Sequence, residues 1–235
     1  IVGESGCGKS VTVQSIMGLI PMPPGRITSG SALLRGHEIL GTAMIQGRDI
    51  RGSEIGMIFQ DPMTSLNPTM SIGDQIAEPL QVHKGYDYRK AYSEAIKLLE
   101  LTKIPESTKR AKQYPFEFSG GMLQRAMIAM AISCKPSILI ADEPTTALDV
   151  TIQAQILDLL QELQRETGMA IVLITHDLGV VARLANEVAV MYAGKIVEHG
   201  SVEDIFYRSA HPYTLGLREA MPTNDPDKQS VLSPI

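Results

Sequence analysis

The sequence predicts an α/β fold with a mainly parallel sheet, a small antiparallel β flap and an inserted helical subdomain. Two short, unbroken apolar runs, Ile138–Ala141 and Ala170–Ile174, have the character of buried parallel strands. Between them, apolar residues at helical spacing from Ile152 to Leu163 predict a crossover helix. Because such a unit is right-handed, both strands end at one edge of the sheet, where open α/β sheets bind ligands.

Length and composition limit the class of protein. The 235 residues suffice for one large α/β domain, and 44% apolar residues supply a sizeable core. The net charge of −5, with mixed signs along the chain, gives no basic surface for a nucleic-acid partner. No apolar run approaches the ~20 residues that span a bilayer. Because two cysteines are too few for a disulfide framework or a metal cluster, we expect a reduced intracellular protein.

The first motif is a phosphate loop of the form G-x-x-x-x-G-K-S at Gly3–Ser10. Its glycines let backbone N–H groups turn toward phosphate oxygens, Lys9 supplies a charge for the β and γ phosphates, and Ser10 can hold Mg²⁺. Apolar residues from Val11 to Ile20 continue as a helix whose N-terminus faces the anion. The residues predicted to bind ATP are Gly3, Glu4, Ser5, Gly6, Cys7, Gly8, Lys9, Ser10 and Val11.

The segment after this helix has the character of a small antiparallel β flap at about residues 27–60. Residues 31–35 and 54–59 are rich in the apolar or β-branched side chains that strands favour. Glycines interrupt the stretch between them, as turns require.

Residues 72–135 are predicted to form the helical subdomain. Apolar residues recur at helical spacing over 72–101, with a break at Gly85, and a second helical run covers 122–133. The subdomain is inserted into a single domain of residues 1–221, whose core we place in residues 1–71 and 136–221.

Two carboxylates end the first buried strand. Asp142 and Glu143 follow directly after Ile138–Ala141, so both are expected at the ligand-binding edge of the sheet. Asp142 can bind Mg²⁺ through water, and Glu143 is placed to polarise an attacking water. Two acids after a strand more often form a solvated turn. Together with the phosphate loop, however, they predict a P-loop NTPase with a RecA-like core.

A third motif starts a helix with Ser119-Gly120-Gly121. Glycines there let backbone amides approach a phosphate, and Ser119 adds a hydroxyl at the N-cap. On this motif the chain resembles the ATP-binding subunits of ABC transporters, whose signature reads Leu-Ser-Gly-Gly-Gln. Phe118 and Met122 depart from that signature, while its anion-binding centre is intact.

Other motifs of that family follow in the expected order, and the resemblance covers the chain from the phosphate loop to about residue 221. Gln60 matches the Q-loop glutamine, which can reach Mg²⁺ or the attacking water. Asp149, in Thr146–Asp149, matches the D-loop, which in this family passes across a dimer interface. His176 matches the switch histidine, which can hydrogen-bond the γ-phosphate and hold the water with Glu143.

The resemblance implies ATP hydrolysis at a site completed by two subunits docked head to tail. The implied catalytic residues are Glu143, His176 and Gln60, and the implied ligands of Mg²⁺ are Ser10, Gln60 and Asp142. The residues implied to contact the ATP held by the partner subunit are Ser119, Gly120, Gly121 and Asp149.

The resemblance also implies partners and a location. These are a second ATP-binding subunit, identical or paralogous, membrane permease subunits, and indirectly a solute-binding protein, with no nucleic acid. The protein would lie peripherally on the cytoplasmic face of the cell membrane. The permease is expected to dock around Gln60–Pro68, a loop stiffened by two prolines.

The run Gln60–Pro68, together with Ala77–Leu80 and His211–Thr214, resembles the dipeptide and oligopeptide importer branch, which also includes nickel importers. We therefore expect import of peptides, with nickel or another small solute as the alternative. Members of the branch commonly continue into a cysteine-bearing segment that binds an iron–sulfur cluster, and two cysteines cannot make such a site.

Classes outside transport were also considered. An ABC ATPase of DNA repair would need a long heptad coiled coil between the motifs, and one of translation would need two nucleotide domains. This sequence contains neither. A nucleotide sensor without turnover would be favoured by loss of Glu143 or His176, and both are retained.

Both ends of the sequence are expected to be cut. Ile1 and Val2 are all that remains of the strand that should precede the phosphate loop, and the first residue is not Met. Residues 222–235 are turn-rich and polar, as in a shortened linker. In this family an upstream aromatic residue stacks on adenine, so we expect these residues alone to bind ATP weakly.

Overall fold

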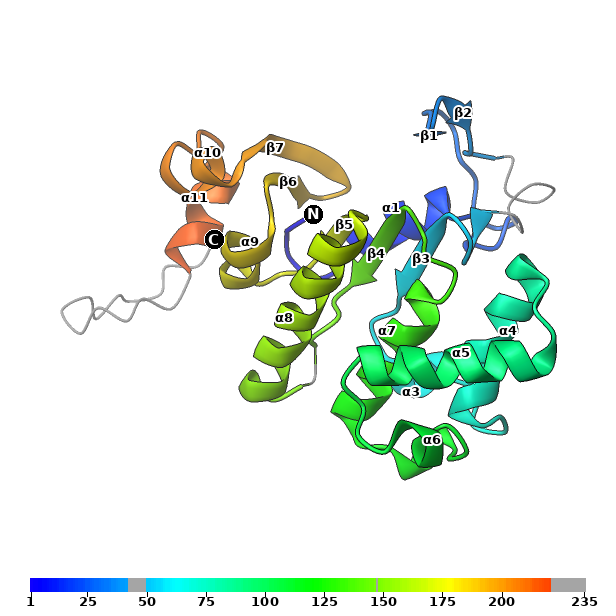
Figure 1. The fold of residues 1–235 in the computed structure, drawn as a ribbon. Helices are drawn as coiled ribbons and strands as arrows, with labels where there is room; N and C mark the ends of the chain where they lie inside the picture. Colours follow the sequence, from blue (N-terminus) through cyan, green and yellow to red (C-terminus); the bar gives the residue numbers. More distant parts are fainter. Residues whose placement is uncertain (42–49, 147, 221–235) are drawn as a thin grey trace. The chain divides into compact units, whose positions relative to one another are not determined.

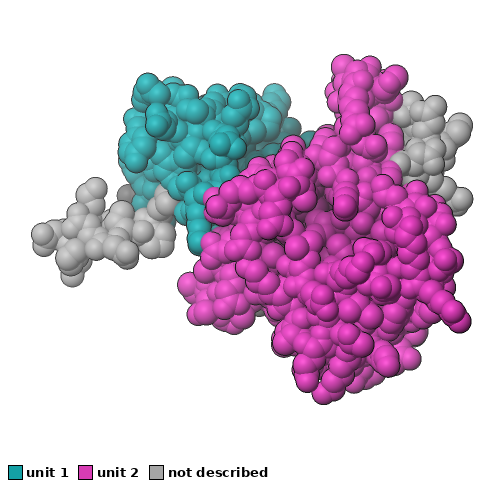
Figure 2. Space-filling view, in the orientation of Figure 1, with its two compact units in different colours: residues 1–12, 173–235 teal, residues 13–172 magenta. Residues whose placement is uncertain are grey.

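The computed structural model describes residues 1–41, 50–146 and 148–220. The chain divides into two compact units (Figure 2): unit 1 comprises residues 1–12 and 173–235, and unit 2 comprises residues 13–172. Within the described residues, no helix is long and apolar enough to cross a lipid bilayer.

Unit 1 is built around the start of the chain. Val2 forms parallel bridges with Thr175 and with Val190, so the segment entering the phosphate loop is paired on both sides. Two antiparallel strands form a hairpin, β6 (Glu187–Tyr192) and β7 (Lys195–Ser201). Val2 also belongs to the apolar core of this unit, together with Leu178, Val181, Val188, Val190, Ile205 and Tyr213.

Each helix of unit 1 begins at a residue that caps it. Asp177 accepts hydrogen bonds from the first turn of α9 (Leu178–Leu184), and Ser201 caps α10 (Val202–Tyr207). The Nδ1 atom of His211 accepts from the Tyr213 amide at the start of α11 (Pro212–Glu219). No helix or strand was predicted after His176 from the periodicity of the sequence. The hairpin and these three helices are therefore seen only in the structure.

Unit 2 contains a sheet of three strands in the order β3-β4-β5. These are β3 (Ile55–Ile58), β4 (Ile138–Asp142) and β5 (Ala170–Ile174), whose last residues belong to unit 1. β3 and β4 are parallel, and Ile58 pairs with Ala141. The strands expected at residues 138–141 and 170–174 are therefore confirmed as neighbours in one sheet. The expected burial is confirmed for most of β4 but not for β5, in which only Ile174 is buried.

The flap is smaller than expected, and the assignment of residues 54–59 to it was wrong. β1 (Leu33–Leu34) and β2 (His37–Glu38) form the antiparallel pair. β3 instead pairs in parallel with β4. The physical reason is burial on both faces, since all four residues of β3 are buried and none alternates toward solvent. Residues 42–49 of the expected flap lie outside the described residues.

The helical part of unit 2 matches the predicted runs. α4 (Ile72–Lys84) packs on α5 (Tyr88–Leu101), and both pack on α7 (Gly120–Ile132), as Figure 1 shows. Gly85 ends α4 with a φ of 65°, which confirms the predicted break. The shorter helices are α3 (Pro62–Ser65), α6 (Ser107–Arg110) and the 3₁₀ turn at Pro115–Glu117.

The helix between β4 and β5 is α8 (Val150–Thr167), which confirms the predicted crossover helix. Its buried face is made of Ile156, Leu157, Leu159, Leu160 and Leu163. Asp149 caps its first turn, and Gly168 ends it in the left-handed conformation. The first helix of the chain, α1 (Lys9–Ile16), begins in unit 1 and continues into unit 2.

Candidate functional site

The phosphate loop in unit 1 is organised around the side chain of Lys9. The residue is 4% exposed, and its ammonium group donates to the carbonyl oxygens of Gly3 at 2.7 Å and Glu4 at 2.9 Å. Both acceptors are neutral, so these contacts leave the positive charge of Lys9 uncompensated. A buried, uncompensated cation inside a glycine-rich turn favours an anionic ligand.

The backbone of the loop needs its glycines for two different reasons. Gly6 and Gly8 have φ values of 81° and 105°, in the region that favours glycine. A methyl group on Gly3 would lie 2.2 Å from the carbonyl oxygen of Met191, so the β6–β7 hairpin approaches the loop too closely for a side chain. The amide of Gly194 in the turn of that hairpin donates to the Cys7 carbonyl at 2.8 Å.

The residues predicted to bind ATP differ in their accessibility. Those at the mouth of the loop and at the start of α1 are exposed or half-buried: Glu4, Ser5, Gly6, Gly8, Ser10 and Val11. The buried ones are Gly3, Cys7 and Lys9. The start of α1 and the mouth of the loop therefore present accessible residues that a phosphate could reach.

His176 lies in the same unit as the loop. Because Thr175 and Val2 are bridged in parallel, His176 and Gly3 each follow one residue later at the same end of their strands. The His176 side chain is exposed. Asp177, next to it, uses its carboxylate to cap α9. The sequence prediction that His176 stands at a strand end is confirmed.

In unit 2 the structure brings Gln60 and Glu143 together. Ile58 pairs with Ala141, and Gln60 and Glu143 each follow two residues later, just beyond the ends of β3 and β4. The amide nitrogen of Gln60 donates to Oε2 of Glu143 at 3.1 Å, and the hydroxyl of Thr146 donates to the same oxygen at 2.9 Å. The carboxylate of Glu143 is thereby aimed by two neutral donors.

Sequence reasoning missed the role of Thr146, which it placed in the D-loop run without assigning it to Glu143. The only signal in the sequence was that Thr146 follows Glu143 by three residues, in a stretch that favours turns. Glu143 itself has a φ of 45°, which is uncommon for a residue with a side chain. Such conformations are concentrated at functional sites, where the surrounding structure holds them in place.

The signature residues and the D-loop form a second cluster in unit 2. The Ser119 hydroxyl caps α7, while Ser119 and Gly120 are exposed. A methyl group on Gly121 would lie 2.9 Å from Cγ2 of Ile152 in the first turn of α8. Asp149 caps that same turn by accepting from the Ile152 amide at 2.9 Å. The residues expected to face a partner's ATP thus lie side by side.

The residues predicted to hold Mg²⁺ present the hard oxygen donors that this ion prefers. They are the Ser10 hydroxyl, the Gln60 side-chain amide and the carboxylate of Asp142, which is 2% exposed. In the described part of the chain, no cluster of three or more His, Cys, Asp or Glu side chains could hold a metal by itself. Ser10 belongs to unit 1, whereas Gln60 and Asp142 belong to unit 2, so a Mg²⁺ site shared by the three stays a prediction.

A family model described as "ABC transporter" matches residues 1–146, more than half of the chain. The chain belongs to the ABC transporter family. A second model, described as "Oligopeptide/dipeptide transporter, C-terminal region", matches residues 197–235 of this ABC protein. The resemblance predicted from the phosphate loop and the signature is confirmed.

The relatives of this ABC protein include ATP-binding proteins of oligopeptide and dipeptide transport. It is 57% identical over 235 residues to the oligopeptide transport ATP-binding protein OppD of Bacillus subtilis, covering 100% of this chain and 66% of the relative. It is also 57% identical to the dipeptide transport ATP-binding protein DppD of the same organism, covering 96% and 67%. OppD of Haemophilus influenzae is 54% identical, with 99% and 72% covered. The chain thus spans about two thirds of the length of these relatives.

Solved structures confirm the fold of this ABC protein as a P-loop NTPase cassette. The dimeric structure of MJ0796, a bacterial ABC transporter cassette, matches with a TM-score of 0.74 and 28% identity, covering 86% of this chain and 83% of that one. A dimeric post-hydrolysis state of MJ0796 bound to ADP and Pi matches equally well, at 27% identity.

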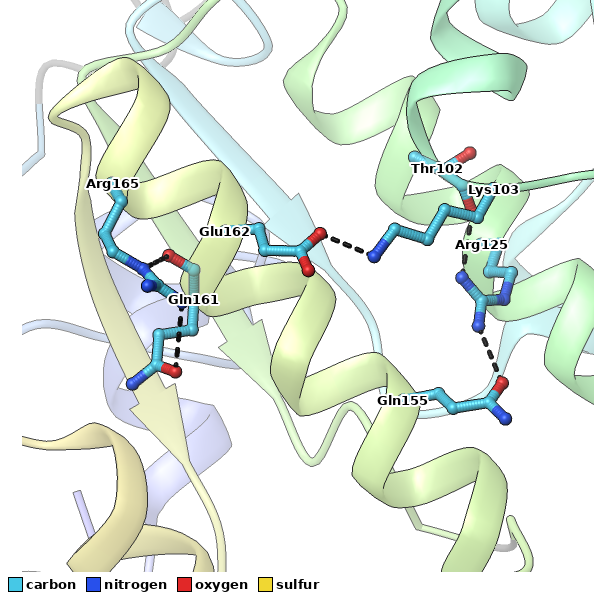
Figure 3. Close-up of polar contacts among 7 residues, drawn as sticks. All are labelled: Thr102, Lys103, Arg125, Gln155, Gln161, Glu162 and Arg165. Carbon is cyan, nitrogen blue, oxygen red and sulfur yellow. Dashed lines mark hydrogen bonds and ion pairs between the residues drawn. The ribbon is translucent and has the colours of Figure 1, made fainter.

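A polar seam in unit 2 of this ABC protein joins α8 to α7 and to the residues that follow α5, and sequence reasoning did not anticipate it (Figure 3). The guanidinium of Arg125 donates to the Thr102 carbonyl at 3.0 Å and to the side chain of Gln155 at 2.9 Å. Lys103 forms an ion pair with Glu162 at 2.5 Å. Burial lowers the pKa of Arg125. The seam attaches the helix that carries the signature to the crossover helix.

Proposed function

We propose that the protein is the ATP-hydrolysing subunit of an importer of oligopeptides and dipeptides. The observation that carries the hydrolytic part is the carboxylate of Glu143, aimed by Gln60 and Thr146 at the end of β4. The peptide substrate rests on the relatives, which are named for oligopeptide and dipeptide transport. Nickel or another small solute is the alternative cargo.

In the proposed reaction, Lys9 exchanges its bonds to the Gly3 and Glu4 carbonyls for bonds to phosphate oxygens, and the loop amides bind the remaining oxygens. Bound Mg²⁺ would neutralise part of the phosphate charge. The residues that would hold the ion are Ser10, Gln60 and Asp142. The other loop residues, Glu4, Ser5, Gly6, Cys7, Gly8 and Val11, line the same phosphates through their backbone.

The proposed general base is Glu143, which polarises the attacking water. Gln60 and Thr146 fix the direction of its carboxylate, so that it needs no reorganisation when the water arrives. His176 is the proposed donor to the γ-phosphate. Each of these side chains is polar and accessible or half-buried, as a group that meets a soluble nucleotide must be.

ATP binding would join two such subunits. Ser119, Gly120 and Gly121 present the N-terminus of α7, and Asp149 lies beside them, so this cluster could meet the γ-phosphate of a nucleotide held by a partner. The solved cassette that this chain resembles is a dimer. Closing of the pair would be transmitted through the loop around Gln60–Pro68 to permease subunits at the cytoplasmic face of the membrane, with a solute-binding protein as an indirect partner.

Phosphate release with Mg·ATP tests the hydrolytic proposal. Lys9→Ala should abolish nucleotide binding, because it removes the cation of the loop. Glu143→Gln should retain binding and lower kcat at least ~100-fold, since a general base contributes 10²–10⁴-fold. Glu166→Gln, which changes the same group at an exposed position of α8, is the control and should leave kcat unchanged. Full activity in Glu143→Gln would overturn the assignment.

An uptake assay tests the cargo. Cells that lack this subunit should regain uptake of a labelled tripeptide when they express the wild-type protein, but not the Lys9→Ala variant. Uptake of ⁶³Ni²⁺ in the same cells distinguishes the alternative. Restored nickel uptake without restored peptide uptake would overturn peptide import and leave the ATPase proposal intact.

A further inference from the structure

We infer that Tyr213 is a positioning residue for the phosphate loop, and that through it the C-terminal part of the chain supports nucleotide binding. The hydroxyl of Tyr213 accepts a hydrogen bond from the backbone amide of Glu4 at 3.0 Å, across 209 residues of sequence. Both residues belong to unit 1. The inference rests on the proposed nucleotide binding at this loop.

The contact falls on the peptide group that Lys9 also uses. The N–H of Glu4 and the C=O of Gly3 belong to one peptide unit, which is planar. Its carbonyl accepts from the ammonium of Lys9 at 2.7 Å, while its N–H donates to Tyr213. Two partners at opposite ends of a planar group fix its rotation. Without the Tyr213 hydroxyl, this peptide unit would lose the hydrogen bond at its N–H end and keep only the bond from Lys9 to the Gly3 carbonyl.

Tyr213 is itself fixed firmly enough to act as a support. Its side chain is 6% exposed and packs in the apolar core of unit 1, which includes Val2 at the entry to the loop. Its ring lies 4.5 Å from the ring of Tyr192, at 44°. Burial raises the pKa of the Tyr213 hydroxyl, which keeps the group protonated and neutral at physiological pH.

The start of α11 is anchored independently of the loop. The carboxylate of Glu198 in β7 accepts from the amides of Ala210 at 2.7 Å and His211 at 3.2 Å. Burial of Glu198 opposes its ionisation, but hydrogen bonds that include these two amides hold the pKa of Glu198 below its ordinary value. His211 then caps the Tyr213 amide. A continuous set of contacts therefore runs from β7 through α11 to the phosphate loop.

These supporting residues lie in residues 197–235, the part matched by the oligopeptide/dipeptide C-terminal model, and not in the part matched by the general ABC model. The His-Pro-Tyr-Thr run of the sequence thus acquires a physical role. When a phosphate draws the Lys9 ammonium away from the Gly3 carbonyl, Tyr213 keeps the peptide unit in its orientation. The expected consequence is tighter nucleotide binding, with little effect on the chemical step.

Tyr213→Phe tests this role because it removes the hydroxyl and leaves the ring. Titration with a fluorescent ATP analogue should show Kd raised about 3- to 10-fold, as expected for one hydrogen bond, and KM for ATP should rise with kcat within about twofold. Tyr192→Phe, the same change in the neighbouring tilted ring, should alter neither. Unchanged nucleotide affinity in Tyr213→Phe overturns the inference, and so does an equal loss in both variants.

Hydrogen exchange of the Glu4 amide, followed by NMR without nucleotide, tests the contact separately from the proposed function. We expect exchange at Glu4 to accelerate about fivefold or more in Tyr213→Phe and to stay unchanged in Tyr192→Phe. Accelerated exchange with a wild-type protein that binds no ATP would contradict the proposed function alone. Exchange at the wild-type rate in Tyr213→Phe would contradict the positioning role alone.

Discussion

At the scale of single residues, Glu143 combines backbone strain with two aimed hydrogen bonds. Its φ of 45° costs roughly 1–2 kcal/mol for a residue with a Cβ atom. The donors Gln60 and Thr146 both bond to Oε2 of its carboxylate, at 3.1 Å and 2.9 Å. A strained residue that is also oriented by neighbours is typical of a preorganised catalytic group.

Thr146→Val should therefore lower kcat several-fold and leave KM for ATP nearly unchanged. Valine matches the shape of threonine but cannot donate to Glu143, so the carboxylate loses one of its two guides. Steady-state phosphate release at saturating Mg·ATP measures the effect. Thr151→Val, at an exposed position of α8, is the matched control. A wild-type kcat in Thr146→Val would show that orienting the Glu143 carboxylate does not require the hydrogen bond from Thr146.

At the scale of elements, a buried amide ties the linker between α3 and α4 to the start of α4. The side chain of Gln75 is 5% exposed. It accepts from the Asn67 amide at 2.8 Å and donates to the carbonyls of Asn67 at 3.0 Å and Met70 at 3.1 Å. The side chain of Gln75 thus helps to hold the segment that follows α3 to the helical part, together with the buried side chain of Leu66.

Gln75→Leu should destabilise unit 2 by about 2–3 kcal/mol, because the partly buried backbone groups of Asn67 and Met70 lose their partners. Urea unfolding followed by circular dichroism measures the change. Gln81→Leu, one and a half turns further along α4 and half-buried, should change stability by about 0.5 kcal/mol or less. Equal unfolding free energies of the two variants would contradict the proposed stabilisation of the α3–α4 linker by Gln75.

The polar seam on α8 has a strong contact from Arg125 of α7 and a weak one from Lys103, which follows α5. Arg125 is partly buried and bonded to a backbone carbonyl, so Arg125→Leu should cost about 1.5–3 kcal/mol of unfolding free energy. Lys103 and Glu162 are about half exposed, so Lys103→Ala should cost less than about 1 kcal/mol. Thermal or urea unfolding of both variants tests this ranking, and a larger cost for Lys103→Ala would reverse it.

At the scale of the whole molecule, we expect ATP to control association. In a Glu143→Gln background, Mg·ATP should shift the protein from monomer to dimer in light scattering. Adding Ser119→Arg should abolish that shift, because a long cation would replace the small cap at the exposed start of α7. Ser119→Thr retains a capping hydroxyl and should still dimerise. Dimers that form unchanged with Ser119→Arg would exclude the composite site.

The local features of the fold were predictable from the sequence because each depends on near neighbours. Gly85 ends α4 where the periodicity broke, and α8 presents the apolar face that its spacing predicted. The family resemblance predicted Gln60 and the position after a buried strand predicted Glu143, and the parallel register of β3 and β4 brings the two into hydrogen-bond contact. The division into a core and an inserted subdomain stays a prediction.

The sequence by itself determined the chemistry of this protein, since glycine conformations, a buried lysine and strand-end carboxylates are properties of residue type and spacing. Only the tertiary structure decided that β3 pairs in parallel with β4, that Thr146 bonds to Glu143, and that Tyr213 reaches the phosphate loop. The physical reason is the range of the interactions. Periodicity records whether a residue is buried, whereas its partner, in the case of Tyr213 209 residues away, is chosen when the whole chain packs.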